Sequence, residues 1–286
     1  MNKQEIKSVG VVVKPDFREA WATASELSKW FEKRGIKSFT EKNNHDSGIE
    51  TVSPEVFKEN ADLIVVLGGD GTMISTARLT GSRAIPVLGI NYGSLGYLTD
   101  FRIEEMFDAL AAILGGDCEI DSRVMLDVEH RRETDTLSTG RVLNDVVINR
   151  AVLAKIIEVE ITLNDLYVNS FRADGMIVAT PTGSTAYSLS AGGPIVYPSM
   201  NAVVLTPVCP FTLTNRPIVI PDTAEIKLKL KSKSEGVMLT LDGQVGYQMQ
   251  PEDYVVIRKS ATSFNLVQPP NRNYFDVLRN KLKWGR

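Results

Sequence analysis

The sequence predicts an α+β chain of two domains. The first is an N-terminal α/β parallel-sheet (Rossmann-like) domain over residues 1–122, and the second is a C-terminal antiparallel β-sandwich over residues 123–268. Two observations support this prediction. Strand-length apolar runs alternate with helix-spaced apolar residues in the first part, whereas beyond residue 123 short apolar runs follow one another with almost no helix. Residues 269–286 are expected to form a helical tail that packs back on the first domain.

The first domain alternates predicted strands with predicted helices. Apolar residues recur at helical spacing over residues 17–33, and Gly35 ends that helix. Parallel sheets of this kind bind ligands at the carboxyl ends of their strands, so a site is expected there. The predicted strands are 9–13, 63–67 and 85–90, and the predicted helices are 17–33, 73–79 and 104–114.

The second domain is predicted from short apolar runs separated by turn residues. Asn164 and Asp165 form a plausible two-residue hairpin turn between two of these runs. So many strands with so little helix indicate a sandwich. The predicted strands are 124–129, 142–148, 156–163, 166–171, 176–179, 203–207, 218–220, 226–230, 238–241, 255–258 and 264–267.

Composition favours a soluble cytoplasmic protein. Of the 286 residues, 43% are hydrophobic and 23% are charged, and the net charge of -3 gives no support for a nucleic-acid or membrane partner. No apolar stretch approaches the ~20 residues of a membrane span, and the N-terminus has no signal-peptide core. Cys118 and Cys209 are too few for a disulfide framework or a zinc site.

Histidine is scarce, and this limits the chemistry that the chain can perform. His45 and His130 are the only two, and both stand in polar, loop-like sequence with no partner motif. A serine–histidine triad or a histidine metal site would need one of them. Acid–base chemistry is therefore expected from a carboxylate.

The most informative carboxylate is Asp70. It follows a buried apolar strand and two glycines, within the run Gly68-Gly-Asp-Gly-Thr72, and precedes a predicted helix. A strand, a glycine-rich turn and a helix N-terminus together make a phosphate seat. A carboxylate there repels phosphate unless it takes a proton or steers a metal. The other interpretation is that Asp70 simply caps the helix.

A second informative segment spans residues 172–194. A short apolar strand is followed by small, hydroxyl-bearing, glycine and proline residues, with no lysine or glutamate between Ala173 and Pro194. Such a segment packs few large side chains, but it can present hydroxyls and N–H groups to a polar ligand. Tyr187 offers a flat apolar surface for a ring.

In these motifs the sequence resembles the NAD kinase family. Phosphofructokinases and diacylglycerol-kinase-like lipid kinases share the first motif, whereas the run over 180–187 is specific to this family. Asp145 stands where many members carry glutamate, which keeps the carboxylate. The motifs that carry the resemblance are Gly68-Gly-Asp-Gly-Thr72, Asn91-Tyr-Gly-Ser-Leu-Gly-Tyr-Leu98, Leu143-Asn-Asp-Val-Val-Ile148, Asp174-Gly175, Thr180-Pro-Thr-Gly-Ser-Thr-Ala-Tyr187, Ala191-Gly-Gly-Pro194 and Leu241-Asp-Gly-Gln244.

The resemblance implies transfer of a phosphoryl group from ATP to the 2′-hydroxyl of the adenosine ribose of NAD, which gives NADP. Asp70 would be the base or the acceptor that orients this hydroxyl. Asn144 and Asp145 would hold the riboses and adenine, and Asp174 would lie near the nicotinamide. The donor loop would comprise Gly68, Gly69, Gly71 and Thr72. The remaining NAD-binding candidates are Gly71, Lys155, Arg172, Thr185, Ala186, Tyr187, Ser188, Leu189, Ser190 and Gln244. Lys155 fits a solvated strand lysine equally well.

Three further expectations complete the sequence-based hypothesis. Magnesium is expected on the ATP phosphates, because no residue cluster resembles a metal cage made by the protein alone. A homodimer or homotetramer is expected, assembled mainly through the second domain. The alternatives are a lipid kinase, which should offer an apolar acceptor cleft, and a non-catalytic dinucleotide-binding regulator, which would gain nothing from Asp70.

Overall fold

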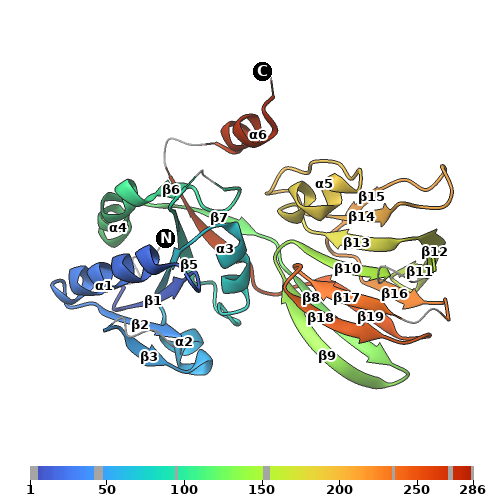
Figure 1. Cartoon of the computed structure of the whole chain (residues 1–286), viewed down its shortest axis with the longest axis horizontal. Helices are drawn as coiled ribbons and strands as arrows, with labels where there is room; N and C mark the ends of the chain where they lie inside the picture. Colours follow the sequence, from blue (N-terminus) through green and yellow to red (C-terminus); the bar gives the residue numbers. More distant parts are fainter. Residues whose placement is uncertain are drawn as a thin grey trace. The chain divides into compact units, whose positions relative to one another are not determined.

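A computed structural model describes residues 6–41, 48–93, 96–150, 155–233, 236–269 and 273–284. The chain divides into two compact units, one made of Met1–Ser122 with Phe264–Arg286 and the other of Arg123–Ser263 (Figure 1). The first is built on a mainly parallel sheet and the second on two antiparallel sheets, which confirms the predicted fold class. Within the described ranges, no helix combines the length and the apolar character that crossing a membrane requires.

The sheet of the first unit has the order β3-β2-β1-β4-β5-β20-β7, with β6 beside β5. The central β4 is buried along its whole length because it consists of five apolar residues, as a strand covered on both faces requires. The strands are β1 (Ser8–Val13), β2 (Lys37–Glu41), β3 (Glu50–Val52), β4 (Leu63–Leu67), β5 (Pro86–Asn91), β6 (Phe101–Arg102), β7 (Glu119–Arg123) and β20 (Phe264–Gln268).

Helices of the first unit follow ordinary local signals. The first helix buries one apolar stripe, which includes Trp21, Leu27 and Phe31. Ser53 caps the second helix by accepting from the Val56 N–H, and Gly116 ends the fourth in a left-handed conformation. The helices are α1 (Arg18–Glu32), α2 (Pro54–Asn60), α3 (Asp70–Ala77), α4 (Met106–Gly115), which follows the 3-10 turn η1 (Ile103–Glu105), and α6 (Tyr274–Leu282).

The strand expected at 264–267 in the second domain lies elsewhere. It is β20, which pairs in parallel with β5 in the sheet of the first unit, with Leu266 opposite Val87. On its other side β20 lies beside β7, and the hydroxyl of Ser122 in β7 bonds to the side chain of Asn265 in β20 at 2.9 Å. The sequence-based assignment failed because an apolar five-residue run has the same composition in either kind of sheet.

The second unit is a sandwich of two six-stranded sheets, ordered β15-β14-β13-β10-β17-β18 and β12-β11-β16-β19-β8-β9. One apolar core, with buried residues from both sheets, lies between them. The strands are β8 (Leu126–Arg132), β9 (Asp135–Val142), β10 (Asp145–Arg150), β11 (Ile157–Leu163), β12 (Leu166–Ala173), β13 (Gly175–Ala179), β14 (Ala202–Val208), β15 (Ile218–Pro221), β16 (Ile226–Leu230), β17 (Val237–Leu241), β18 (Val245–Met249) and β19 (Tyr254–Lys259).

In this unit the predicted hairpin at residues 164–165 is present, whereas the strand predicted over 142–148 is interrupted. Asn164 and Asp165 both adopt positive φ between β11 and β12, which confirms the predicted two-residue hairpin. The single strand predicted over 142–148 is wrong, because β9 ends at Val142 and β10 begins at Asp145. The residues between them form a corner at which the chain passes from one sheet to the other.

Close packing at Gly10 gives a test of the first unit. A Cβ added there would lie 2.4 Å from the ring of Phe57, which is fully buried and packs edge-on against Phe39. Gly10→Ala should therefore lower the free energy of unfolding by about 1–3 kcal/mol, although alanine normally suits a strand better than glycine.

Urea unfolding of Gly10→Ala, Phe57→Leu and the double variant measures this effect. We expect the double variant to be less destabilised than the sum of the two single variants, because the smaller side chain makes room for the methyl group. Strict additivity would contradict the packing argument.

Candidate functional site

The turn after β4 begins with two glycines. A Cβ on Gly68 would lie 2.5 Å from the Thr72 hydroxyl oxygen, so a side chain has no room there. Gly69 is the N-cap of α3, and its carbonyl accepts the Thr72 and Met73 N–H groups at 2.9 and 3.1 Å. Asp70 is therefore the first residue of the helix and makes no capping bond, so the helix-cap interpretation of Asp70 is wrong.

The Asp70 carboxylate bonds instead to the loop that follows β5. Its Oδ2 accepts the Tyr97 N–H at 2.8 Å, and its Oδ1 accepts the Leu98 N–H at 3.0 Å and the Thr99 hydroxyl at 3.2 Å. A Cβ on Gly96 would lie 1.9 Å from Oδ1, so glycine is required there. A carboxylate has about four acceptor directions, and these bonds use three of them.

The same loop is stiffened by the side chain of Asn91 at the end of β5. Its amide donates to the Thr99 hydroxyl at 2.8 Å, and its oxygen accepts the Gly93 N–H at 2.8 Å. The pKa of the Tyr97 phenol is raised, mainly because the phenol is partly buried and also because the negative charge of Asp70 lies nearby. Two of the sequence motifs thus meet at one carboxylate of fixed orientation.

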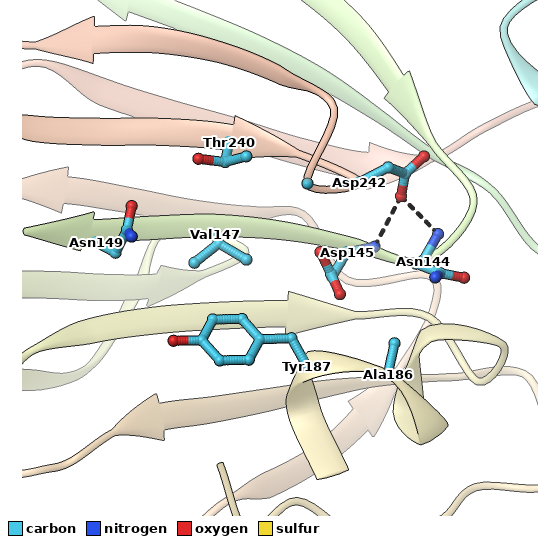
Figure 2. A pocket seen from close by; sticks show the side chains of 9 residues that line it. Asn144, Asp145, Val147, Asn149, Ala186, Tyr187, Thr240 and Asp242 are labelled. Atoms are coloured by element: carbon cyan, nitrogen blue, oxygen red, sulfur yellow. Dashed lines mark hydrogen bonds between the residues drawn. The ribbon is translucent and has the colours of Figure 1, made fainter. Parts of the chain in front are cut away.

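The second unit holds a cavity of about 300 Å³ on its own (Figure 2). Alternate residues of β10 line it, because successive side chains of a strand point to opposite faces. The intervening Val146 and Ile148 belong to the sandwich core. The lining residues are Asn144, Asp145, Val147, Asn149, Ala186, Tyr187, Thr240, Asp242 and Gly243.

Asp242 holds one end of this cavity together. Asp242 and Gly243 both have positive φ, in a turn closed by the Gln244 N–H on the Leu241 carbonyl at 3.0 Å. The Asp242 carboxylate accepts the N–H groups of Leu143, Asn144 and Asp145 at 3.0, 2.7 and 3.0 Å. Two of these bonds, to Asn144 and Asp145, are drawn in Figure 2. The corner between β9 and β10 is therefore built on one side chain.

The two neighbouring carboxyl groups create an unusual electrostatic environment. Asp145 is only 5% exposed. Its pKa is raised to about 7, mainly by this burial and also by the negative charge of Asp242. Asn144 lies beside it with a buried amide oxygen that accepts no hydrogen bond from any described residue. The end of the cavity thus combines a carboxyl group that titrates near neutral pH with an amide whose oxygen needs a donor.

Several hydroxyl groups of the segment 180–190 form hydrogen bonds within the protein. Thr180 donates to the Leu143 carbonyl at 2.6 Å, and Ser184 donates to the Pro181 carbonyl at 2.6 Å. Ser188 is buried and bonds to the Thr206 hydroxyl at 2.9 Å. These bonds hold the 3-10 turn η2 (Gly183–Thr185) and the short helix α5 (Tyr187–Ser190), from whose start Tyr187 reaches the cavity (Figure 2).

Two family models match the chain in succession. The ATP-NAD kinase N-terminal domain matches residues 9–118, and the ATP-NAD kinase C-terminal domain matches residues 143–269. The chain belongs to the NAD kinase family. Its curated relatives include the NAD kinases of Geobacter sulfurreducens, 47% identical over 98% of this chain and 99% of that protein, and of Solibacter usitatus, 42% identical over 98% of each.

Solved structures of NAD and NADH kinases share the fold. Yeast NADH kinase complexed with NADH superposes with a TM-score of 0.90 at 23% identity, over 99% of this chain and 89% of that one. An NAD kinase from Archaeoglobus fulgidus in complex with ATP gives a TM-score of 0.73 at 27% identity, over 96% and 98%. The resemblance and the fold that the sequence predicted are both confirmed.

The cavity brings together only part of the NAD-binding set that the family resemblance predicted. Asn144, Asp145, Ala186 and Tyr187 line it. The other candidates that the structure places in the second unit, none of which lines this cavity, are Lys155, Arg172, Asp174, Thr185, Ser188, Leu189, Ser190 and Gln244.

Two of these charged candidates already have partners. Asp174 accepts the Arg150 Nε at 2.7 Å. The Arg172 guanidinium lies 5.1 Å from the centroid of the Phe211 ring. Both groups therefore start from an existing interaction, which a ligand would have to share or replace.

Sequence reasoning missed five residues that line the cavity: Val147, Asn149, Thr240, Asp242 and Gly243. A signal for the first two was available, because residues 145, 147 and 149 share one face of a strand. Asp242 stood in a motif quoted for the family, but its role depends on backbone groups 97 to 99 residues away in sequence.

The described histidine is buried rather than in a loop. His130 lies in β8, 2% exposed and 3.2 Å from Asp253, so its loop-like interpretation is wrong. His45 lies outside the described residues. Among the residues that are described, no three His, Cys, Asp or Glu side chains are grouped to hold a metal ion.

The raised pKa of Asp145 predicts a pH-dependent stability. The folded protein keeps this proton to about pH 7, whereas the unfolded chain loses it near pH 4, so the free energy of unfolding should fall as the pH rises between those values. Asp145→Asn does not titrate. The stability of this variant relative to wild type should therefore increase over that range, by at most about 1.4 kcal/mol per pH unit.

Urea unfolding at pH 5 and pH 7.5 checks this expectation. Asp165→Asn, at an exposed turn position in the same unit, is the matched control. A difference between Asp145→Asn and wild type that is the same at both pH values would show that Asp145 does not carry the raised pKa.

Proposed function

We propose that this chain transfers the terminal phosphoryl group of ATP to the 2′-hydroxyl of the adenosine ribose of NAD, which gives NADP. One observation carries the proposal: a carboxylate, Asp70, is fixed at the N-terminus of α3 by three bonds, the ones that the described residues make to it, out of about four that a carboxylate can accept. Family membership identifies the acceptor class. Relatives solved with ATP and with NADH support the two substrate types.

In the proposed reaction, Asp70 accepts the hydrogen bond of the 2′-hydroxyl and takes its proton as the new O–P bond forms. The three donors from the loop over 97–99 hold the carboxylate in one orientation, which lowers the cost of positioning the acceptor. The protein has little other covalent work in phosphoryl transfer, since positioning and charge neutralisation dominate.

The donor loop would be formed by Gly68, Gly69, Gly71 and Thr72. Gly69 and Gly71 leave space at this turn, since a Cβ built on either meets nothing, and the N-terminus of α3 favours the negative charge of phosphates. The N–H groups of Gly68 and Thr72 already bond to the Ile90 and Gly69 carbonyls, so these two residues would shape the loop rather than donate to phosphate. Mg²⁺ carried on the ATP phosphates would neutralise their charge.

The cavity of the second unit would hold NAD. An amide oxygen without a donor at Asn144 and the carboxyl of Asp145 suit ribose hydroxyls and the adenine amine, and Tyr187 suits a ring. Hydrogen-bonding side chains at these positions favour a dinucleotide over the lipid that an apolar acceptor cleft would bind. A cytoplasmic location is part of the same proposal.

Incubation of the pure protein with Mg-ATP and NAD, followed by mass spectrometry of the products, tests the proposal directly. NADP formation that depends on both substrates is expected. ATP consumption without NADP, or a phosphorylated lipid in place of NADP when lipid is supplied, would overturn it.

Asp70→Asn should lower kcat by about 100-fold or more, because it removes the proton acceptor. The substitution also places an amide NH₂ against one of the loop donors, so stability must be measured as well. Thr99→Val is the matched control, since it removes the bond of Thr99 to Asp70 and that of Asn91 to Thr99 but leaves the carboxylate.

We expect Thr99→Val to lose less than about tenfold in kcat while it is destabilised to a similar extent as Asp70→Asn. Steady-state kinetics and thermal unfolding of both variants provide the comparison. If the two variants lose the same amount of activity, Asp70 acts only by holding the loop.

Tyr187→Ala should raise the KM for NAD by about 10- to 100-fold, the scale of losing one base–aromatic stack, with little change in the KM for ATP. Tyr187 is 43% exposed and lines the cavity. Tyr167→Ala, at a more exposed tyrosine of the same unit outside the cavity, should leave both constants unchanged. Equal increases in both KM values would show that Tyr187 does not act on NAD alone.

We also propose a homodimer or homotetramer assembled through the second unit. Its surface carries exposed large apolar side chains, including Leu166, Phe211 and Leu213 at 73%, 64% and 87% exposure. Light scattering across a dilution series, run beside the activity assay, should show activity falling as the oligomer dissociates. A monomer that is fully active at all concentrations would contradict the proposal.

A further inference from the structure

Asn149 is a side chain of the cavity to which the family resemblance assigns no role. It lies on β10, on the same face as Asp145 and Val147 (Figure 2). Its amide oxygen Oδ1 is buried, and no described group of the protein donates a hydrogen bond to it. Buried polar groups in folded proteins nearly always have a partner, so an oxygen left without one in a cavity is a group that a ligand can satisfy.

The strand beside Asn149 carries a glycine where any side chain would crowd Asn149. Gly175 of β13 pairs directly with Asn149, so a side chain at 175 would point to the same face. A Cβ there would lie 3.2 Å from the Asn149 Cβ and 2.6 Å from the Ile148 carbonyl oxygen. This close approach of the two strands requires glycine, which gives the Asp174-Gly175 motif a physical reason beside Asn149.

The chemistry of the neighbours narrows what Asn149 can bind. Thr240 of β17 pairs with Val147 of β10 and adds a hydroxyl to the same wall of the cavity. The aromatic ring of Tyr187 lies on the facing side (Figure 2). A ring that packs against Tyr187 would present its edge to this wall. A side-chain amide carries a donor and an acceptor side by side, so it matches an edge that carries the complementary pair.

We propose that Asn149 is a specificity-determining residue that recognises a donor–acceptor edge of the bound dinucleotide. This inference rests on the proposed function, because NAD supplies the ligand. NAD has two such edges, the carboxamide of nicotinamide and the six-amino edge of adenine. Both offer an NH₂ to the orphan oxygen of Asn149, and the experiment distinguishes them.

The test compares wild type with Asn149→Leu, which keeps the approximate volume but removes both hydrogen-bonding groups. Asn149→Ala is a second variant in case leucine disturbs the fold, and Asn169→Leu on β12, outside the cavity, is the matched control. Each protein is given NAD, nicotinic acid adenine dinucleotide, in which a carboxylate replaces the carboxamide, and nicotinamide hypoxanthine dinucleotide, in which an oxo group replaces the amine. NAD binding is measured by calorimetry as well as by turnover.

We expect wild type to prefer NAD over one of the two analogues by tenfold or more in kcat/KM, and Asn149→Leu to lose that preference. If the analogue that wild type rejects is nicotinic acid adenine dinucleotide, Asn149 binds the carboxamide edge. If it is nicotinamide hypoxanthine dinucleotide, Asn149 binds the adenine edge. The KM and the dissociation constant for NAD should rise by about 10- to 100-fold in Asn149→Leu, with the KM for ATP unchanged.

Two results would overturn the inference. Affinity for NAD within twofold of wild type would show that Asn149 does not bind it. Equal weakening for all three dinucleotides, with the preference retained, would show that Asn149 only shapes the cavity. A wild-type protein that neither binds NAD nor forms NADP would instead contradict the proposed function.

Discussion

The acceptance of three consecutive backbone N–H groups by the Asp242 carboxylate is the interaction on which the cavity of the second unit depends. Those groups lie where the chain leaves one sheet and enters the other, so neither ladder can satisfy all of them. Charge-assisted bonds of this kind are roughly twice as strong as neutral ones. They direct Asn144 and Asp145 to the cavity, and they place a negative charge beside Asp145 that helps to raise its pKa.

The first unit uses the same device at Asp70. There too a carboxylate accepts backbone N–H groups from a distant loop, and a glycine at position 96 keeps the contact close. The difference lies in exposure. Asp242 is almost buried, whereas Asp70 is partly accessible and retains an acceptor direction. One arrangement therefore serves architecture and the other leaves a group available for chemistry.

Local patterns in the sequence were sufficient for the fold class and drew attention to Asp70 and Tyr187, whereas Asn144 and Asp145 were named from the family resemblance. Apolar periodicity and glycine placement act over a few residues, so they can be recognised without a structure. The break between β9 and β10 and the parallel pairing of β20 could not be predicted in this way. Both depend on partners about 100 residues or more away, Asp242 for the corner and β5 for the returning strand.

The return of β20 to the first sheet has a consequence for how the chain is made. In sheet order, β20 lies between β5 and β7, although the bonded side chains of Ser122 and Asn265 are 143 positions apart. The second unit is thus an insertion between two adjacent strands. On a ribosome, the parallel sheet keeps a gap until β20 emerges, directly after β19, the last strand of the sandwich. The unit that holds Asp70 therefore completes its sheet only after the whole second unit has been synthesised.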